Sequence, residues 1–434
     1  MFNKMLEQQF DLTGHNTTFK QECIAGLTTF LTMAYIIFVN PAMLADAGMD
    51  HGSVFVATCL AAAIGCFVMG LLANYPIALA PGMGLNAFFT YTVVLDLGYS
   101  WQVALGGVFL SGIAFTVLSL FSVREWIINS IPQSLRYGIA AGIGVFLAFI
   151  ALKNAGIVVD NQATLVTMGD ITTMEPVLAA LGLFLIVGFV KKGINGAVML
   201  SILTITLIAV ITGLVKFNGL VSMPPSLAPT VMELDIKGAL EVSMLSVIFA
   251  FLFVDLFDTS GTLIAVAQRG KLLDEAGKLP RLNKALLADS SATVAGSMLG
   301  TSTTTSYVES TAGVSAGGRT GLTAVVVGVL FLLSLFLAPL AGMVPAYATA
   351  GPLFYVAVLM LAGLVNVDWD DLLEAVPVAV ILITMPLTFS IANGIAFGFI
   401  SYVAVRIFSG KASTLNASVS ILAALFILKF AFYG

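Results

Sequence analysis

Two short stretches decide the fold: residues 80–86 read Ala-Pro-Gly-Met-Gly-Leu-Asn, and residues 300–306 read Gly-Thr-Ser-Thr-Thr-Thr-Ser. The first places a proline and two glycines where an apolar helix should be under way, which predicts extended chain before a short helix. The second is too polar and β-prone for a helix that faces lipid. Non-helical backbone is tolerated at membrane depth only where protein or a water-filled cavity covers it. Both stretches are therefore predicted to cross near the bilayer midplane, with half-helix N-termini presenting free N–H groups to a ligand.

The composition around these stretches is that of an integral membrane protein. Of the 434 residues, 59% are hydrophobic and 9% are charged, whereas soluble domains average about 25% charged residues. A helical crossing needs roughly 20 apolar residues, so this length predicts a dozen or more spans. The net charge of −5 is spread over loops and forms no basic stripe, which excludes nucleic acid as a partner.

The apolar segments form two series of seven, followed by one further segment. The first series covers residues 24–41, 54–73, 84–96, 101–121, 135–152, 176–190 and 195–215. The second covers residues 242–267, 284–299, 306–316, 319–342, 347–366, 373–388 and 392–408. The last segment, 415–433, is predicted to span the membrane, to lie on its surface or to pack along the bundle, and the sequence leaves these three open.

Two short matches relate the two series. Ile131-Pro132 before the fifth segment resembles Val344-Pro345 before the twelfth, and Ile194-Asn195-Gly196 resembles Ala392-Asn393-Gly394 before the last. Because each series has an odd number of spans, the second copy enters the membrane from the opposite side. The sequence therefore predicts an all-α polytopic membrane protein with a 7+7 inverted repeat of 14 spans, and short extended segments in spans 3 and 10. Inverted repeats are typical of transporters.

Lysine and arginine predict the orientation, because they collect in cytoplasmic loops. With the N-terminus inside, 14 of the 18 Lys and Arg residues lie on the cytoplasmic side. Only Lys153, Lys216 and Lys237 lie outside, and Lys429 belongs to the last segment. Residues 1–23 are polar, show no signal peptide, and are predicted to form a cytoplasmic tail.

Four acidic residues fall inside membrane segments, where a charged group is costly and marks a functional site by default. Asp255 and Asp258 lie with Thr259 on one face of the eighth helix, which therefore cannot face lipid. Glu309 follows the Ser/Thr-rich stretch in the first turn of the tenth segment, where the helix dipole stabilises a negative group. Asp289 lies inside the ninth segment.

Several of these positions have a structural alternative. Asp258 precedes Thr-Ser-Gly and either contacts substrate or ties down the local backbone. Asp289 lies close to Lys284, which favours a structural ion pair or helix cap. Asn86 opens the short third helix, where it caps the helix, binds a ligand, or does both.

Three longer motifs resemble a known family. Residues 80–89 read Ala-Pro-Gly-Met-Gly-Leu-Asn-Ala-Phe-Phe, residues 254–263 read Val-Asp-Leu-Phe-Asp-Thr-Ser-Gly-Thr-Leu, and residues 300–311 read Gly-Thr-Ser-Thr-Thr-Thr-Ser-Tyr-Val-Glu-Ser-Thr. They resemble the azaguanine-like purine permeases of the nucleobase:cation symporter superfamily. The likeness runs from Gly-Leu-Thr-Thr-Phe-Leu-Thr-Met-Ala-Tyr at 26–35 through Gly-Gly-Arg-Thr-Gly-Leu at 317–322 to the fourteenth span.

The resemblance implies a fold similar to that of the uracil permeases. A core domain would comprise spans 1–4 (24–122) and 8–11 (240–342), and a gate domain spans 5–7 (123–216) and 12–14 (343–410), before the C-terminal apolar segment 411–434. It also implies a multi-pass protein of the cell membrane that imports purines by proton symport. The core would carry the purine past the gate in an elevator-like movement, a homodimer would form through the gate helices, and the proton gradient would replace any cofactor.

The resemblance also implies the site. Substrate binding falls to Asn86 on the third span, Asp255 on the eighth and Glu309 on the tenth, with backbone groups near Met83 and Val308 and the neighbouring Thr259 adding contacts. An ionised carboxylate only accepts hydrogen bonds, so hypoxanthine and guanine, which offer N–H donors, are favoured. Adenine would need a protonated carboxylate or Asn86 opposite its ring nitrogen. The coupled proton is predicted to reside on Asp255, Glu309 or Asp258, because low dielectric and neighbouring carboxylates favour the protonated form.

Other classes of protein fit less well. An enzyme would need a nucleophile with its base, or a metal cluster, and the two histidines, His15 and His51, lie in the tail and an outer loop. No catalytic or metal-binding residue is therefore predicted. A channel fits the inverted repeat and broken helices less well than a carrier does. Uracil and xanthine stay open as alternative substrates of the same architecture.

Overall fold

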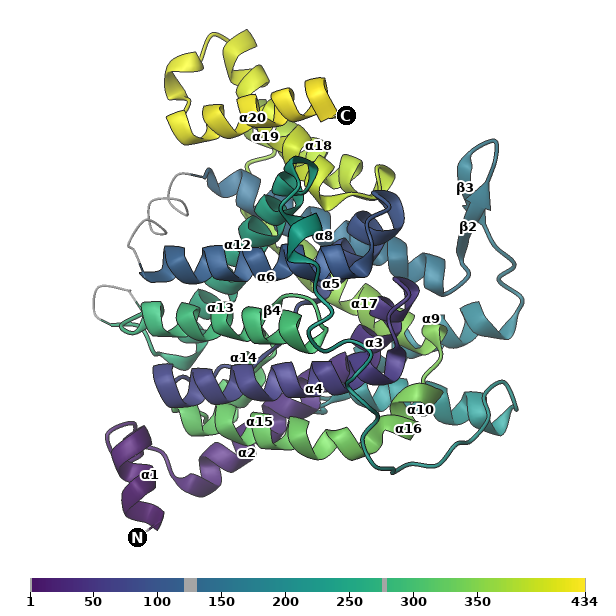
Figure 1. The fold of residues 1–434 in the computed structure, drawn as a ribbon, viewed down its shortest axis with the longest axis vertical. Coiled ribbons are helices and arrows are strands. Elements are labelled where there is room, and N and C mark those ends of the chain that lie inside the picture. The colour runs from purple at the N-terminus through teal and green to yellow at the C-terminus, as the bar shows by residue number, and fades with distance from the viewer. Residues whose placement is uncertain (1, 121–130, 275–278, 434) are drawn as a thin grey trace.

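The computed structural model describes residues 2–120, 131–274 and 279–433, and these residues form a bundle made mostly of helices (Figure 1). The predicted domain boundary at residues 122 and 123 lies outside the described residues.

Each of the seven segments predicted in the first series contains a helix. The first segment is α2 (Phe19–Met33) followed by α3 (Ile36–Asp46), and the second is α4 (His51–Val68) with η1 (Met69–Ala73). The third is α5 (Met83–Ala87) continued by η2 (Phe88–Asp96). The remaining four are α6 (Trp101–Leu120), α8 (Gln133–Asn154), α9 (Met174–Lys191) and α10 (Ala197–Ile211).

The second series is confirmed in the same way. It begins with η3 (Val242–Met244), α12 (Leu245–Gly270), α13 (Leu282–Leu299) and the short α14 (Ser310–Ser315). The eleventh segment is α15 (Gly321–Ser334), η4 (Leu335–Leu337) and α16 (Ala338–Met343). The last three are α17 (Ala346–Leu361) with η5 (Ala362–Asn366), α18 (Leu372–Leu387) and α19 (Ile391–Phe408).

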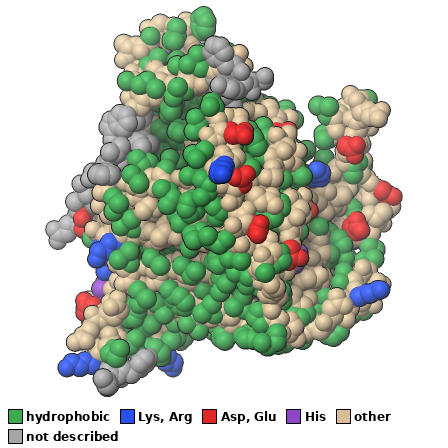
Figure 2. Space-filling model, in the orientation of Figure 1, with side chains coloured by type: hydrophobic (Ala, Val, Ile, Leu, Met, Phe, Trp, Pro, Cys, Tyr) green, Lys and Arg blue, Asp and Glu red, His purple; other side chains and the backbone are tan. Residues whose placement is uncertain are grey.

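The surface of the bundle is apolar. Within the described ranges, nine helices are long and apolar enough to cross a membrane, and α10 and α18 are shorter apolar helices. Large hydrophobic side chains on the outside include Phe184, Leu207 and Leu387, which are 68%, 58% and 71% exposed. Figure 2 shows hydrophobic side chains over most of one face, with the charged side chains in small groups. Apolar surface of this extent is suited to contact with lipid.

Several features were not predicted. The tail contains α1 (Phe2–Phe10), and a hairpin of β2 (Val158–Asn161) and β3 (Leu165–Met168) projects between α8 and α9 (Figure 1). A single helical turn, α11 (Ile236–Ala239), precedes the eighth segment. The last segment is α20 (Ala417–Tyr433), which packs along α19, where the Phe397 and Phe430 rings stack with centroids 5.1 Å apart. The structure thus shows α20 packed against α19, and whether this segment spans the membrane or lies on its surface stays a prediction.

The two repeat matches differ in quality. Pro132 and Pro345 both stand at the N-cap, directly before α8 and α17, so the first match marks equivalent helix starts. In the second match, Gly196 is the N-cap of α10, but α19 already starts at Ile391 and so contains Gly394. Only the first match therefore aligns the two helices at the same position.

The two stretches that break the third and tenth segments pair with each other. Strand β1 (Leu79–Pro81) runs antiparallel to β4 (Thr304–Ser306), with Ala80 opposite Thr305. Beyond the strands, the amide of Gly82 donates to the Thr303 carbonyl at 2.9 Å, and the amide of Tyr307 donates to the Ala78 carbonyl at 2.9 Å. The predicted extended conformation is confirmed, and the pairing explains how this backbone is satisfied at membrane depth.

Glycines permit close backbone contact between α15 and the end of the second segment. A Cβ on Gly321 would lie 2.0 Å from the carbonyl oxygen of Gly70, and because the nearest atoms of Gly70 are all backbone, no side chain can move aside to make room. Gly321→Ala should therefore push these elements apart, and we expect a loss of stability of about 1–3 kcal/mol. Thermal unfolding of the detergent-purified protein measures the loss.

Gly188→Ala is the matched control for this substitution, because a Cβ at Gly188 in α9 meets nothing within 4 Å. There the helix should be unchanged or slightly more stable, since glycine inside a helix costs about 0.5–1 kcal/mol relative to alanine. Equal unfolding temperatures for Gly321→Ala and Gly188→Ala would contradict the proposed close contact.

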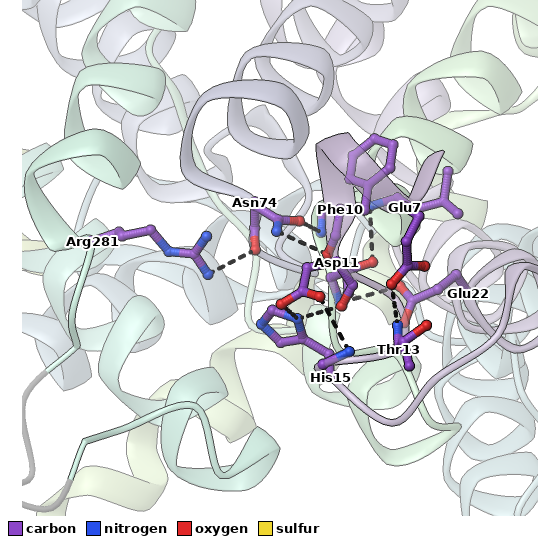
Figure 3. A network of polar contacts seen from close by, with 12 residues as sticks. Glu7, Phe10, Asp11, Thr13, His15, Glu22, Asn74 and Arg281 are labelled. Atoms are coloured by element: carbon purple, nitrogen blue, oxygen red, sulfur yellow. Dashed lines mark hydrogen bonds and ion pairs between the residues drawn. The ribbon is translucent and has the colours of Figure 1, made fainter. Parts of the chain in front are cut away.

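The N-terminal segment is fastened to the bundle around Asn74 (Figure 3). The Asn74 side chain donates to the Phe10 carbonyl at 3.2 Å and accepts from the Gly321 amide at 2.6 Å. Its own carbonyl accepts a bond from Arg281 at 3.4 Å. Phe10 and Leu12 are buried with Leu322. The predicted tail is therefore an ordered part of the fold, held against the ends of the second, ninth and eleventh segments.

Candidate functional site

A cavity of about 100 Å³ lies where the β1–α5 and β4–α14 stretches meet α12. Holding one water takes only about 10–15 Å³ on this measure, so the cavity admits a larger molecule. One wall comes from the third, eighth and tenth segments and from Tyr35, and the opposite wall is apolar and comes from α8 and α17. The lining residues are Tyr35, Gly82, Met83, Gly84, Leu85, Ile143, Val254, Asp258, Thr262, Thr305, Ser306, Tyr307, Val308, Glu309, Val356 and Met360.

Glu309 stands at the start of α14, where the chain leaves β4. Its backbone occupies the N-cap position, but its side chain makes no capping bond. Instead, its carboxylate accepts a hydrogen bond from the Tyr35 hydroxyl at 2.6 Å. The Tyr307 hydroxyl donates to the Pro81 carbonyl at 2.5 Å and holds the two broken segments together beside the cavity. The Glu309 carboxylate is thus positioned while part of its hydrogen-bonding capacity stays free for a ligand.

The polar side chains of α12 form two groups, one that lines the cavity and one that is buried behind it. Asp258 and Thr262 line the cavity, and the Asp258 side chain is exposed to it. Asp255 is 1% exposed and Thr259 is fully buried, and neither lines the cavity. Thr259 forms a 2.7 Å hydroxyl contact with Thr305 of β4. In this conformation, therefore, Asp258 and Glu309 are the carboxylates that a bound molecule would meet.

Asn86 does not cap the third helix, contrary to the expectation. The helix starts at Met83 with Gly82 as its N-cap, because the Pro81-Gly82 pair ends the extended segment one turn earlier than expected. The Asn86 side chain is buried, and its oxygen accepts a hydrogen bond from the Ser302 hydroxyl. Its amide nitrogen has no hydrogen-bond partner. Asn86 therefore ties the third segment to the tenth from behind the cavity.

Asp289 is also placed differently from the expectation. It is fully buried on α13, and its carboxylate accepts a hydrogen bond from the Ser306 hydroxyl at 3.0 Å. The ion pairs recorded among the described residues are His15 with Asp11 and Arg406 with Glu374, so the expected pair with Lys284 is not formed there.

Met83, Val308, Asp258 and Glu309 are the predicted site residues that line the cavity, whereas Asp255, Asn86 and Thr259 form a layer behind it. Sequence reasoning missed Tyr35 and Ser306, although both lie in motifs that had been singled out. It also missed the apolar wall of Ile143, Val356 and Met360, which no sequence signal separates from side chains facing lipid.

The fold matches that of solved membrane transporters. The transmembrane domain of the cyanobacterial bicarbonate transporter BicA aligns with a TM-score of 0.67 at 17% identity, covering 87% of this chain and 97% of that domain. Murine Slc26a9, an anion transporter solved in the inward-facing state, aligns with a TM-score of 0.66 at 11% identity, covering 90% and 68%. The chain is thus a multi-pass membrane protein with the 7+7 inverted-repeat transporter fold.

Sequence comparison gives the family. A model of the permease family matches residues 20–397, and the chain belongs to this family. The Escherichia coli adenine permease AdeP is 52% identical over 428 residues, covering 99% of this chain and 96% of that protein. The Bacillus subtilis guanine/hypoxanthine permease PbuG is 48% identical over 436 residues, covering 98% of each. The predicted membership among the purine permeases is confirmed.

Proposed function

We propose that this chain is a carrier that moves purine nucleobases across the cell membrane. The observation that carries this proposal is 48–52% identity along nearly the whole chain to permeases named for adenine and for guanine/hypoxanthine. The cavity is consistent with this role because it combines two carboxylates with an apolar wall. Small-molecule sites are commonly apolar with a few polar groups that fix orientation.

The purine is held between the third, eighth and tenth segments. The carboxylates of Asp258 and Glu309 accept hydrogen bonds from ring N–H groups, and backbone groups near Met83 and Val308 add further bonds. Asp255, Asn86 and Thr259 support this wall from behind in the conformation described. Two acceptors favour hypoxanthine and guanine over adenine. Adenine is the second candidate because of the identity to AdeP, and it requires one of the carboxylates to be protonated.

Binding to the purified protein tests the substrate class. Labelled adenine, guanine and hypoxanthine should each be tested for saturable binding, with uracil and xanthine as competitors. At least one of the three purines should bind, and neither uracil nor xanthine should displace it. Binding of uracil alone would contradict a purine site.

The carrier works by elevator-like alternating access driven by proton symport, in which Asp255, Asp258 or Glu309 holds the proton. The core of residues 24–122 and 240–342 moves against the gate of residues 123–216 and 343–410. Helix packing supports this division. Within the core, α13 packs on α4 and α6, and α15 packs on α2 and α4. Within the gate, α17 packs on α8 and α9, and α18 packs on α8 and α19.

The N-terminus is cytoplasmic, and exposed apolar gate residues such as Phe184 on α9 are available for a homodimer contact.

Contacts around Phe389 would close one end of this carrier. Phe389 lies between α18 and α19, and its carbonyl accepts a hydrogen bond from Thr92 of η2 at 3.0 Å. Its ring meets Tyr91 of η2 edge to face, with centroids 6.0 Å apart, and the Lys153 ammonium lies 5.3 Å from its centroid. These residues lie two to three turns beyond the cavity residues of α5 and α8. In the predicted orientation, they form the outer closure between core and gate.

Phe389→Ala should therefore favour the outward-open conformation. We expect a cysteine introduced at Val308, which lines the cavity, to react at least about tenfold faster with a membrane-impermeant maleimide added outside, since loss of about 1.4 kcal/mol shifts an equilibrium tenfold. Phe397→Ala is the control, because its ring stacks on Phe430 away from this closure. Equal labelling rates in the two variants would show that Phe389 does not close the outer end.

A further inference from the structure

Asp289 is a buried acidic group to which the proposed function gives no role. It is 0% exposed on α13, and one of its carboxylate oxygens accepts the Ser306 hydroxyl at 3.0 Å. The other oxygen has no hydrogen-bond partner. A buried carboxylate without a cation or a full set of donors is costly in its ionised form. The structure gives Asp289 neither.

Asp255 lies next to Asp289 and is still less well satisfied. Its Oδ1 has no partner, and its Oδ2 lies 3.5 Å from the Thr293 hydroxyl. That hydroxyl has one proton, which it donates to the Thr304 carbonyl at 2.8 Å. The Thr293 proton is therefore directed mainly at the Thr304 carbonyl, and its contact with Asp255 is long and weak. The buried Asp255 carboxylate thus lacks the strong donors that its ionised form would need.

The charges around Asp255 and Asp289 also disfavour a state in which both carboxyl groups are ionised. Asp255 is close enough to Asp289 and to Asp258 for the three carboxylates to repel one another. Glu309, which lines the cavity together with Asp258, repels that carboxylate in the same way. The groups that face the pair from α12, α13 and β4 are hydroxyls and carboxylates, and none of the ion pairs recorded among described residues includes them. Adjacent carboxylates that cannot both ionise share a proton.

Ser306 connects this pair to the substrate cavity. It lines the cavity and at the same time donates to Asp289 from β4. A hydroxyl can accept a proton on its oxygen and pass its own proton onward. A proton arriving at Ser306 Oγ from the cavity can thus be replaced by one moving from that oxygen to Asp289 Oδ1, and the reverse steps return it. Ser306 stays neutral before and after, and the helices need not separate.

We propose that Asp255 and Asp289 together form the proton-carrying site of this transporter, separate from the purine-binding carboxylates and loaded through the Ser306 hydroxyl. This proposal rests on the proposed function and adds Asp289 and Ser306 to it. The proton enters from the cavity while the cavity is open to one side of the membrane. It stays on the pair while the core moves, and it leaves by the same hydroxyl on the other side. The purine and the proton therefore occupy different places during the movement.

Asp289→Asn tests the assignment in proteoliposomes. Purine exchange at equal pH on both sides needs no net proton movement, so we expect its rate to stay near that of the wild type. Proton entry per purine and accumulation driven by a pH gradient should both fall by about a hundredfold, in line with the loss of a group that transfers protons. Internal pH is followed with a trapped dye, and purine with a label. Wild-type proton entry in Asp289→Asn would overturn the proposal.

Two further variants separate proton transfer from structural damage. Ser306→Ala should slow proton entry by a larger factor than it slows purine exchange at equal pH. Ser297→Ala should change neither rate, because the Ser297 hydroxyl bonds within α13 to the Val294 carbonyl. Asp289→Glu restores a carboxyl group and should recover coupled transport.

If Asp289→Asn fails to fold, the infrared carbonyl band of a buried protonated acid tests where the proton resides. That band should be present in the wild type and weakened in Asp255→Asn but unchanged in Asp258→Asn, and the opposite pattern would overturn the proposal. Failure of the wild type to exchange purine would instead reject the proposed function.

Discussion

Glu309→Gln is expected to lower purine uptake by about a hundredfold or more, because a site built to accept N–H donors rejects a partner strongly when a buried polar group is left mismatched. The Glu309 carboxylate lines the cavity and is already oriented by the Tyr35 hydroxyl at 2.6 Å. The amide replaces an acceptor by a donor and turns one hydrogen bond to the base into a repulsive contact. Initial uptake rates of the labelled purine at several concentrations measure the loss.

Glu175→Gln is the matched control for this substitution, because Glu175 is exposed in the first turn of α9, away from the cavity. Asp258→Asn should behave like Glu309→Gln, since Asp258 lines the same cavity. Expression and unfolding temperature should be unchanged in Glu309→Gln and in Asp258→Asn. Uptake at the wild-type rate in Glu309→Gln would remove the basis of the proposed site.

Arg406→Ala is expected to have the largest effect on stability, about 3 kcal/mol, because it leaves the other member of a largely buried ion pair without its partner. Arg406 is 5% exposed, donates to the Leu373 carbonyl at 2.9 Å and bonds the Glu374 carboxylate. Its guanidinium also lies 3.5 Å from the centroid of the Tyr402 ring. Because the Ser134 hydroxyl bonds the same carboxylate, the pair joins α8, α18 and α19.

The unfolding temperature of the purified protein measures this effect, with Lys411→Ala as an exposed control. Combining Arg406→Met with Glu374→Gln should recover much of the loss, because removing both charges leaves no unpaired ion. If the double variant is as unstable as the sum of the two single variants, the ion pair is not the cause.

The sequence predicted most of the fold because long apolar segments and proline-glycine breaks are local signals. Residues 80–86 and 300–306 were predicted to be non-helical, and they are the places where β1 and β4 form. Their pairing was not predicted, since Ala80 and Thr305 are far apart in the chain and no local pattern records their contact. The α1 helix was missed for a similar reason, as it is held by tertiary contacts such as the bond from Asn74 to the Phe10 carbonyl.

The site was predicted in part, for reasons that follow from helix geometry. Asp255 and Asp258 are three residues apart and differ by only about 60° around a helix of 3.6 residues per turn. Periodicity therefore placed both on one polar face but could not tell that Asp258 faces the cavity and Asp255 its rear. Asn86 was expected at a helix start, and the true start at Met83 turns its side chain toward Ser302.

Coupling of purine movement to protons is measured by uptake into proteoliposomes that contain only the purified protein. Labelled adenine, guanine, hypoxanthine and uracil should be offered with an inward proton gradient, with and without a protonophore. We expect saturable accumulation of at least one purine that collapses when the protonophore is added, and no accumulation of uracil. Accumulation of none of the purines, or accumulation that is insensitive to the protonophore, would contradict proton-coupled purine transport by this protein.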